Sequence, residues 1–252
     1  MAKEFIVAID GTAGSGKSTT ARLAARELGF LHLDTGAMYR AVTVKVIREK
    51  LDLNDLEKLA RVLAETEIDL VPRKNGNRII LDGEDVTEAV RTPEVDRMVS
   101  HVSVVSSVRE KLVAEQRRIA KGRQVVCEGR DIGSVVFPHA DLKFYVDADL
   151  SARADRRHKE LRGTSGDTKG IQNSEFRIQN SGAGHVPSQS AKSIADNLTE
   201  RDYIDSTRAH SPLTRVRDAI LLDTTNLTVG EEVAIVVLLV RMRMREATGD
   251  RR

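Results

Sequence analysis

One short stretch near the N-terminus constrains the fold more than any other. Residues 11–18 read Gly-Thr-Ala-Gly-Ser-Gly-Lys-Ser and match the G-x-x-x-x-G-K-[ST] pattern of a phosphate-binding loop. An apolar run, 5–9, precedes this loop, and an amphipathic run, 19–28, follows it. A strand that turns through glycines into a helix points successive backbone N–H groups at one anion, and the helix N-terminus adds positive potential. The stretch therefore predicts a site for the phosphates of a nucleoside triphosphate.

Two side chains of the loop have separate uses. Lys17 reaches the outer phosphates of a bound triphosphate, and the hydroxyl of Ser18 is a ligand for Mg²⁺. We therefore expect Mg²⁺ as the cofactor. The residues expected to hold the triphosphate are Gly11, Thr12, Ala13, Gly14, Ser15, Gly16, Lys17, Ser18 and Thr19.

Strand-like and helical runs alternate along the chain. The predicted strands are 5–10, 30–33, 124–127, 142–146 and 219–222. The predicted helices are 17–28, 36–50, 54–66, 106–121, 149–161 and 228–244, with another around 198–207. This alternation predicts an α/β fold with a parallel sheet flanked by helices, in which ligands bind at the carboxyl ends of the strands. For the helix 106–121 we expect Ser106 or Ser107 as the N-cap and Gly122 as the stop.

Two segments interrupt the alternation. Residues 68–71 and 78–81, joined by Lys74-Asn75-Gly76-Asn77, predict a β-hairpin within a small inserted subdomain. Residues 162–193 are rich in Gly, Ser and Asn, and Ile-Gln-Asn-Ser at 171–174 recurs at 178–181, which is typical of a flexible insert without direct chemistry. We expect a core at 1–62, the insert at 63–104, core again at 105–150, a lid at 151–195 and core at 196–252.

Composition limits the partners. Lys and Arg total 40 against 38 for Asp and Glu, and this net charge of +2 gives no argument for nucleic acid or a membrane as a partner. Aromatic residues make up 3%, too few for a surface that stacks bases. The single cysteine, Cys127, excludes an internal disulfide framework and lies in an apolar run, where we expect it to be buried. The N-terminus carries no signal-peptide pattern. We expect a cytoplasmic monomer.

Several charges lie where a purely structural interpretation does not readily explain them. Arg109 and Gln116 fall inside the apolar arc of the helix 106–121, so the arginine must meet an acid or a ligand. Glu128-Gly129-Arg130-Asp131 follows a buried strand, where Arg130 suits a phosphate and Asp131 an exocyclic amine or a partner arginine. A structural ion pair is the alternative at both places.

Three further groups repeat this pattern. Arg201, Asp205 and Arg208 share one helix face, and Arg153, Arg156 and Arg157 share another beside the low-complexity segment. Arg40 follows Asp34-Thr35 after the second strand. Surface ion pairs, a solvated basic face and a helix cap at Asp34 or Thr35 remain as alternatives. Our hypothesis is that Asp34 holds a water of the Mg²⁺ shell.

The chemistry that these residues suit is phosphoryl transfer. No Ser-His-Asp or Cys-His set is evident, and the six histidines show no metal-ligand spacing. Transfer between two phosphates needs no strong general base, because the acceptor oxygen is already ionised and requires positioning and charge neutralisation. A cleft with one phosphate loop and a surplus of arginines provides both.

Seven stretches together resemble the cytidylate kinase family of nucleoside monophosphate kinases. They are 9–18, Leu-Asp-Thr-Gly-Ala-Met-Tyr-Arg at 33–40, Gly-Glu-Asp-Val at 83–86, Val-Arg-Thr at 90–92, Ser-Val-Arg at 107–109, Glu-Gly-Arg-Asp-Ile-Gly at 128–133, and Glu-Arg-Asp at 200–202 with Asp205 and Arg208. The resemblance covers nearly the whole chain. It implies a P-loop NTPase-type fold with an inserted monophosphate-binding subdomain and a lid, and transfer of the ATP γ-phosphate to CMP or dCMP with Mg²⁺.

The resemblance also implies roles for particular residues. Ser100, Arg109 and Asp131 would recognise cytosine; Arg40, Arg130 and Arg208 would hold the acceptor phosphate; and Arg201 and Asp205, with Thr35, would hold the ribose. Lys17, Arg130, Arg153 and Arg157 would serve catalysis, the last two as lid arginines. The segment 162–193 departs from the family, whose lids are shorter.

Two kinds of alternative stay open. Another phosphate-loop kinase would act on UMP, AMP or shikimate. A nucleotide-dependent regulatory or RNA-binding protein would instead use basic or aromatic stripes away from the cleft, of which the sequence has few.

Overall fold

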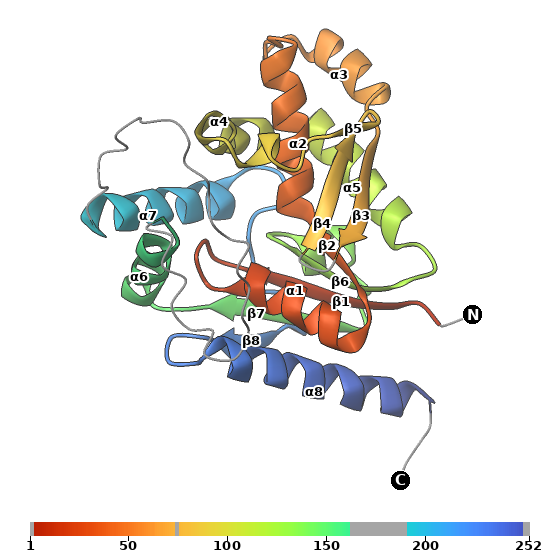
Figure 1. Cartoon of the computed structure of the whole chain (residues 1–252), viewed down its shortest axis with the longest axis vertical. Helices are drawn as coiled ribbons and strands as arrows, with labels where there is room; N and C mark the ends of the chain where they lie inside the picture. Colours follow the sequence, from red (N-terminus) through yellow and green to blue (C-terminus); the bar gives the residue numbers. More distant parts are fainter. Residues whose placement is uncertain (1–2, 74–75, 162–190, 249–252) are drawn as a thin grey trace.

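A five-stranded parallel sheet is the centre of the computed structural model, which describes residues 3–73, 76–161 and 191–248 (Figure 1). The strand order is β2-β6-β1-β7-β8, with every neighbouring pair parallel. The strands are β1 (Phe5–Gly11), β2 (Leu31–Asp34), β6 (Gln124–Gly129), β7 (Leu142–Asp147) and β8 (Ile220–Asp223). The predicted α/β fold is confirmed.

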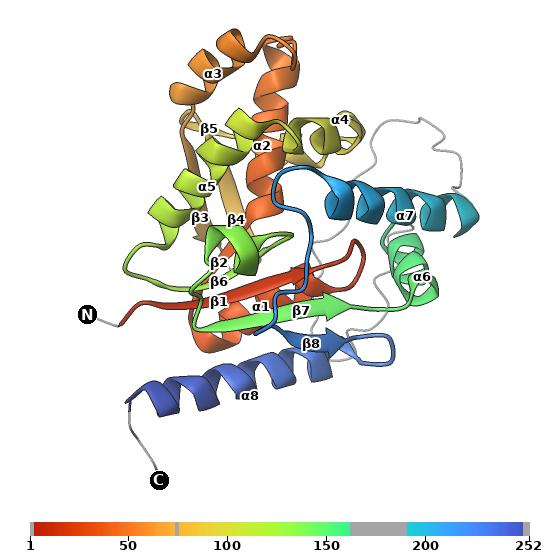
Figure 2. The ribbon, with the colours of Figure 1, turned by 180° about the vertical axis from the view of Figure 1, so that it is seen from behind.

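Both faces of the sheet are covered because β1 is apolar on both sides. Val7 and Ile9 point into one buried cluster, with α1 (Lys17–Leu28) and α8 (Val229–Thr248). Ile6 and Ala8 point into the other, with α2 (Thr35–Arg48) and α5 (Ser106–Ala120). Successive side chains of a strand point to opposite faces, so a continuous apolar run requires a layer of helices on each side. Figures 1 and 2 show these two layers from opposite directions.

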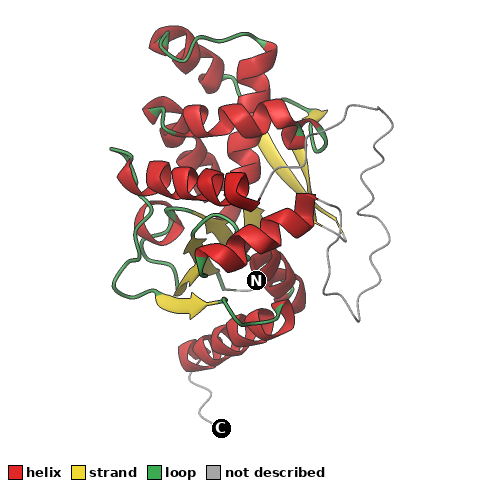
Figure 3. Ribbon diagram, turned by 90° about the vertical axis from the view of Figure 1, so that its left-hand side faces the viewer, coloured by secondary structure: helices red, strands yellow, loops and turns green. Residues whose placement is uncertain are grey.

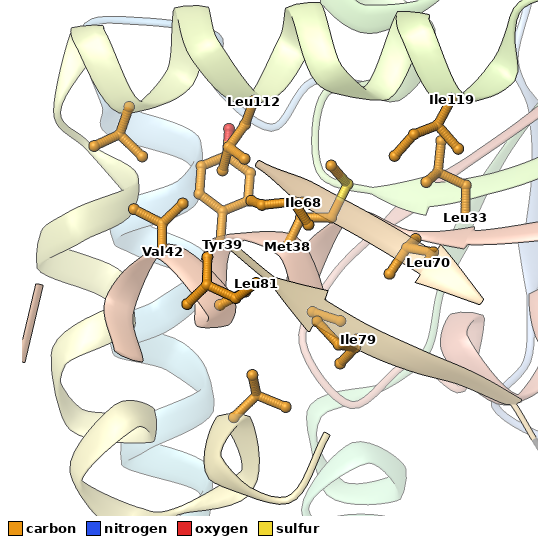
Figure 4. Close-up of a cluster of buried hydrophobic side chains, with 14 of the residues drawn as sticks. Leu33, Met38, Tyr39, Val42, Ile68, Leu70, Ile79, Leu81, Leu112 and Ile119 are labelled. Carbon is orange, nitrogen blue, oxygen red and sulfur yellow. The ribbon is translucent and has the colours of Figure 1, made fainter. Parts of the chain in front are cut away.

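A second, antiparallel sheet lies next to the first. Its order is β3-β4-β5, and the pairing of Ile68 with Leu81 confirms the predicted hairpin. The turn residues Lys74 and Asn75 lie outside the described residues. Inward-facing side chains of the hairpin pack with α2 and α5 in one cluster (Figure 4). The elements of this region are α3 (Leu56–Ala64), β3 (Ile68–Arg73), β4 (Gly76–Leu81), β5 (Glu84–Asp85), the 3₁₀ turn η1 (Ala89–Arg91) and α4 (Pro93–Ser103).

Two helices lie beside the phosphate loop, on the side where the parallel strands end (Figure 1), and Figure 3 views the molecule from that side. These are α6 (Leu150–Leu161) and α7 (Ala191–Thr207), which pack against each other. Nearly all of the low-complexity segment, 162–190, lies outside the described residues, so its predicted role stays a prediction. The division into core, insert and lid likewise remains a proposal.

Local signals predicted the first helix closely and the ends of others less well. Helix α1 has the predicted bounds. The predicted serine cap of α5 is wrong: Val105 is the N-cap, and Ser106 is already helical and donates from Oγ to Glu110 Oε1 at 3.0 Å. Gly122 ends that helix in the left-handed region, with φ 71°, as expected. Helix α4 is one of the short helices expected within the insert, although its bounds were not predicted, and the π-helical turn η2 (Ile132–Val136) was not predicted at all.

Two further observations concern burial and hydropathy. Cys127 is fully buried, as predicted. Within the three described ranges, no helix combines the length and the apolar character that crossing a bilayer requires.

Candidate active site

The phosphate loop connects the central strand to α1. Gly14 and Gly16 have φ of 75° and 90°, which favour glycine, and Gly16 is the N-cap of α1. A Cβ on Gly11 would lie 2.0 Å from the carbonyl oxygen of Val146, so only glycine fits against the neighbouring strand. These local requirements explain the glycine spacing, and they place the first turn of α1 at the carboxyl edge of the sheet.

A cavity of about 190 Å³ opens at this edge. It combines the end of the phosphate loop with cationic and acidic side chains from α2, α7 and the segment after β6, and with uncharged side chains from α4. The predicted site residues that line it are Lys17, Ser18, Asp34, Thr35, Arg40, Ser100, Arg130, Asp131, Arg201, Asp205 and Arg208. Residues more than 190 positions apart in the sequence thus meet around one space.

The remaining predicted residues lie around the cavity without lining it. Arg109 is buried behind Asp131. Arg153 and Arg157 on α6 make other contacts, with Asp202 and with Glu160, so their catalytic role stays a prediction. The other loop residues, Gly11, Thr12, Ala13, Gly14, Ser15, Gly16 and Thr19, form the strand end, the loop and the first helical turn beside the cavity.

Arg109 and Asp131 form a buried ion pair, each residue being 4% exposed. Arg109 also donates from Nη1 to the carbonyl of Ser103 at 3.1 Å, and its Cζ lies 5.6 Å from the ring centre of Tyr39. Nη2 of Arg208 is 3.8 Å from the second oxygen of Asp131. The prediction that Arg109 faces inward is confirmed, and the acid that it contacts, Asp131, borders the cavity.

Arg130 connects the acceptor side to the phosphate loop. Its Nε donates to Asp205 Oδ2 at 2.6 Å, and its Nη1 donates to the carbonyl of Gly11 at 2.9 Å. Asp205 is also 3.6 Å from Nη1 of Arg208. One carboxylate on α7 therefore holds two guanidinium groups at the cavity wall.

Three arginines, Arg40, Arg157 and Arg201, gather around the single carboxylate of Asp96. Nε of Arg40 lies 3.5 Å from Asp96 on α4, and Nη2 of Arg157 lies 4.0 Å from the same carboxylate. Burial, together with the guanidinium groups of Arg157 and Arg40, lowers the pKa of Arg201. Guanidinium groups do not deprotonate in proteins, so this crowding favours an anionic ligand in the cavity.

Glu128 is the functional residue that the sequence interpretation left without a role. It is 2% exposed, accepts a hydrogen bond from Ser18 Oγ, and has His32 Nε2 at 3.0 Å. Burial opposes its ionisation, but His32, Lys17 and Ser18 outweigh burial and lower its pKa. The signal was available: Glu128 ends the apolar strand that pairs with β1, so it had to lie beside the loop.

The amine of Lys17 also lies at this end of the cavity. Nζ donates to the carbonyl of Thr12 at 3.2 Å. Burial, reinforced by the charge of Arg130, lowers the pKa of Lys17 to about 7. A negatively charged ligand would favour the protonated form again, so binding of phosphate and protonation of Lys17 are linked.

Oxygen ligands for a hard cation are present beside Lys17. Ser18 and the carboxylates of Glu128 and Asp34 border the cavity. Asp34 accepts the N–H of Ala37 at 2.9 Å and so caps α2, which was the alternative to a metal role. Burial and the charge of Glu128 raise its pKa. Among the described residues, no group of three or more His, Cys, Asp or Glu side chains is arranged to hold a metal.

This fold and cavity define a class: a P-loop protein whose triphosphate site faces a second site for an anionic ligand. Sequence comparison identifies the family within that class. The profile described as cytidylate kinase matches residues 7–179 and 172–242, and the chain belongs to this family.

Similar proteins from three bacteria carry the name cytidylate kinase. The protein of Pelotomaculum thermopropionicum is 44% identical over 241 residues, which cover 95% of this chain and 97% of that one. The protein of Caldanaerobacter subterraneus is 43% identical, covering 93% and 94% of the two chains. The protein of Chlorobaculum tepidum is 44% identical, covering 94% and 93%.

Proposed function

We propose that the protein transfers the γ-phosphate of ATP to CMP or dCMP, giving ADP and CDP or dCDP. The observation that carries this proposal is that one cavity joins Lys17 and Ser18 of the phosphate loop to Asp131 and to a set of arginines. A P-loop hydrolase or switch protein has no need for a second set of cations facing its triphosphate site. Membership of the cytidylate kinase family supports the choice of acceptor.

The donor half is the phosphate loop with Lys17. Backbone N–H groups of residues 11–19 cradle the β- and γ-phosphates, and the helix α1 adds its positive end. Lys17 moves from the carbonyl of Thr12 to the transferred phosphate, where its ammonium offsets developing charge. We infer that this lysine acts on the reacting group as well as on the bound nucleotide.

Mg²⁺ fits the residues beside Lys17. A metal held by few protein ligands takes the others from the substrate phosphates, as Mg²⁺ does in nucleotide kinases. Ser18 would be the direct ligand, with Glu128 accepting its proton in a hydrogen bond and Asp34 holding a metal-bound water. Mg²⁺ bound there would neutralise charge on the substrate phosphates.

The acceptor half uses side chains from several elements. We propose that Arg40, Arg130 and Arg208 hold the phosphate of CMP and that Thr35, Arg201 and Asp205 hold its ribose. Asp131 would accept from the exocyclic N4 amine of cytosine, while Arg109 and Ser100 donate to the ring acceptors, a pairing that suits cytosine chemically. The contact between Arg109 and Asp131 keeps both side chains oriented toward that role.

The residues then promote an in-line transfer. The attacking oxygen belongs to the acceptor phosphate and is already ionised, so no general base is required. Lys17 and Arg130 stabilise the charge that spreads over the transferred group, and Arg153 and Arg157 of α6 would support them. Arg130 suits this position because it already joins Gly11 to Asp205. We also propose that the protein acts on nucleotides in the cytoplasm as a monomer.

One assay tests the proposal against its alternatives. ADP release is followed in a coupled reaction with ATP, Mg²⁺ and one of CMP, dCMP, UMP, AMP or shikimate. We expect turnover with CMP and dCMP to exceed turnover with the others by at least about a hundredfold in kcat/KM. Preference for another acceptor would reassign the specificity, and ADP release with none of the five would exclude the kinase function altogether.

A further inference from the structure

We infer that Asp202 is a positioning residue that couples the phosphate loop to the acceptor half of the cavity. The inference rests on the proposed function, because it concerns two nucleotides bound together. Asp202 lies on α7 between cavity residues and does not itself line the cavity. Nothing in the phosphate-loop pattern requires an acid at this place.

The peptide groups on both sides of Ala13 are held by side chains from outside the loop. Asp202 Oδ1 accepts the N–H of Ala13 at 2.9 Å, and Asp202 Oδ2 accepts from Nη1 of Arg153. The same Nη1 donates to the carbonyl of Ala13 at 3.1 Å. Arg153 is buried and the side chain of Asp202 is 20% exposed, so this ion pair is partly shielded from water. Side chains of α6 and α7 thus bind both the N–H and the carbonyl of Ala13.

Packing supports the same link independently. The side chain of Ala13 belongs to a small buried cluster with Ala154 of α6 and with Ile194 and Leu198 of α7. A Cβ on Gly14 would lie 3.3 Å from Cβ of Arg153, so the loop and the helix are in close contact. Because such contacts leave no free space, a shift of the loop must move the helices that touch it.

Positions next to Asp202 on α7 bear residues of the proposed acceptor half. Arg201 and Asp205 line the cavity, one residue before and three residues after Asp202. Asp205 accepts a hydrogen bond from Nε of Arg130, and Nη1 of Arg130 donates to the carbonyl of Gly11. The loop is therefore tied to α7 at two points, through Asp202 at Ala13 and through Asp205 and Arg130 at Gly11, and the two acids lie one helical turn apart. By thermodynamic linkage, each nucleotide should then strengthen binding of the other.

The test measures binding rather than turnover. Calorimetry gives the Kd of CMP with and without a non-hydrolysable ATP analogue and Mg²⁺, for the full-length protein. We expect the analogue to tighten CMP binding by about tenfold in the wild type. In Asp202→Ala we expect this ratio to fall to about one, because the loop and α7 no longer share the Ala13 contact. The exposed Asp196 on the same helix provides a matched control, and Asp196→Ala should keep the wild-type ratio.

A purely structural role for Asp202 would give a different result. It would lower the melting temperature without changing the binding ratio. Because Asp202→Ala leaves Arg153 buried without its acid, the double variant Asp202→Ala/Arg153→Met removes both charges and serves if the single variant does not fold. An unchanged ratio in the folded variant, or a wild-type ratio of one, overturns the inference and leaves the proposed function intact. Failure of the wild type to bind CMP overturns both.

Discussion

The two halves of the cavity are built in different ways. The proposed donor half is one continuous segment, in which Gly14 and Gly16 take left-handed conformations. The proposed acceptor half consists of side chains from α2, α4, α7 and the segment after β6, and its acids are paired with arginines, one of which is Arg109 of α5. A backbone site is preorganised by local geometry, whereas a side-chain site needs counter-ions to remain ordered without its ligand.

The pairs within the acceptor half also differ from those on the surface. Arg109 and Asp131 are almost fully buried, whereas Arg48 and Glu84 have side chains 46% and 60% exposed. An exposed pair contributes between about 0 and 1 kcal/mol to stability, but removing one partner of a buried pair costs about 3–5 kcal/mol. Substitutions in the acceptor half should therefore affect both stability and specificity, and substitutions in the donor half chiefly catalysis.

The largest expected effect tests whether the two halves are separable. Lys17→Ala removes the ammonium that meets the transferred phosphate, and we expect kcat to fall by about a thousandfold or more. CMP binding, measured by calorimetry without ATP, should remain within about threefold of the wild type, because Lys17 belongs to the donor half. Loss of CMP binding as well would mean that the two halves of the cavity are not separable.

The next effect concerns base recognition on the acceptor side. Asp131→Asn keeps the shape of the side chain but removes the charge that faces Arg109 and Arg208. We expect kcat/KM for CMP to fall by about a hundredfold relative to UMP, while the Kd of ATP changes little.

Its control is an acid in an exposed pair. Asp69→Asn, whose partner is Arg118, should leave kcat/KM for CMP within about twofold of the wild type. Equal losses of CMP selectivity and ATP affinity in Asp131→Asn would assign Asp131 to the metal or to the fold. Melting temperatures of all three proteins separate specificity from stability.

A smaller effect concerns the uptake of a proton by Lys17 when ATP binds. Because burial lowers the pKa of Lys17 to about 7, most of the free protein at pH 8 carries a neutral amine there. Binding ATP favours the ammonium, so the complex takes up a proton at pH 8, and ATP affinity falls by up to about tenfold per pH unit above 7. Calorimetry in two buffers of different ionisation enthalpy measures this uptake. Lys17→Arg should lose it, since arginine stays charged; an equal uptake in both proteins would contradict the assignment.

The smallest effect concerns Asp96, the counter-ion of Arg40 and Arg157. Asp96 faces Arg40 and Arg157, and its side chain is 33% exposed. An anionic substrate competes with this carboxylate, so Asp96→Asn should lower the KM for CMP by about two- to threefold at low salt. Glu94→Gln on the same helix removes an equal charge away from these arginines and should change nothing. Weaker CMP binding in Asp96→Asn would show that the carboxylate holds the arginines in place.

Prediction from sequence succeeded best where the cause is local. The bounds of α1 follow from Gly16 before the helix and from Gly29, which ends it in the left-handed region. The hairpin follows from two strand-like runs joined by a segment that contains Asn-Gly, and the inward position of Arg109 follows from helical periodicity. Prediction failed at the N-cap of α5. Val105 is the N-cap, and the hydroxyl of Ser106, already within the helix, donates to Glu110.

The sequence predicted which residues border the cavity better than it predicted how they contact one another. Family resemblance named most of the residues that border the cavity, including Arg208, which follows the end of α7. It matched Glu128 and Asp202 but gave neither a role, because their contacts with the loop bridge more than 100 positions of sequence. Nor did helical periodicity distinguish Arg153, which turns to Ala13, from Arg157, which turns toward Asp96.

The sequence by itself determined the phosphate loop, the parallel α/β fold and the family, because glycine geometry, strand alternation and motif spacing are properties of short segments. Only the tertiary structure decided which charges meet: that Asp131 binds Arg109, that Glu128 accepts from Ser18, and that Asp202 reaches Ala13. Electrostatic partners depend on distance through space, and the distance between β6, α1 and α7 is set by how the helices pack on the sheet.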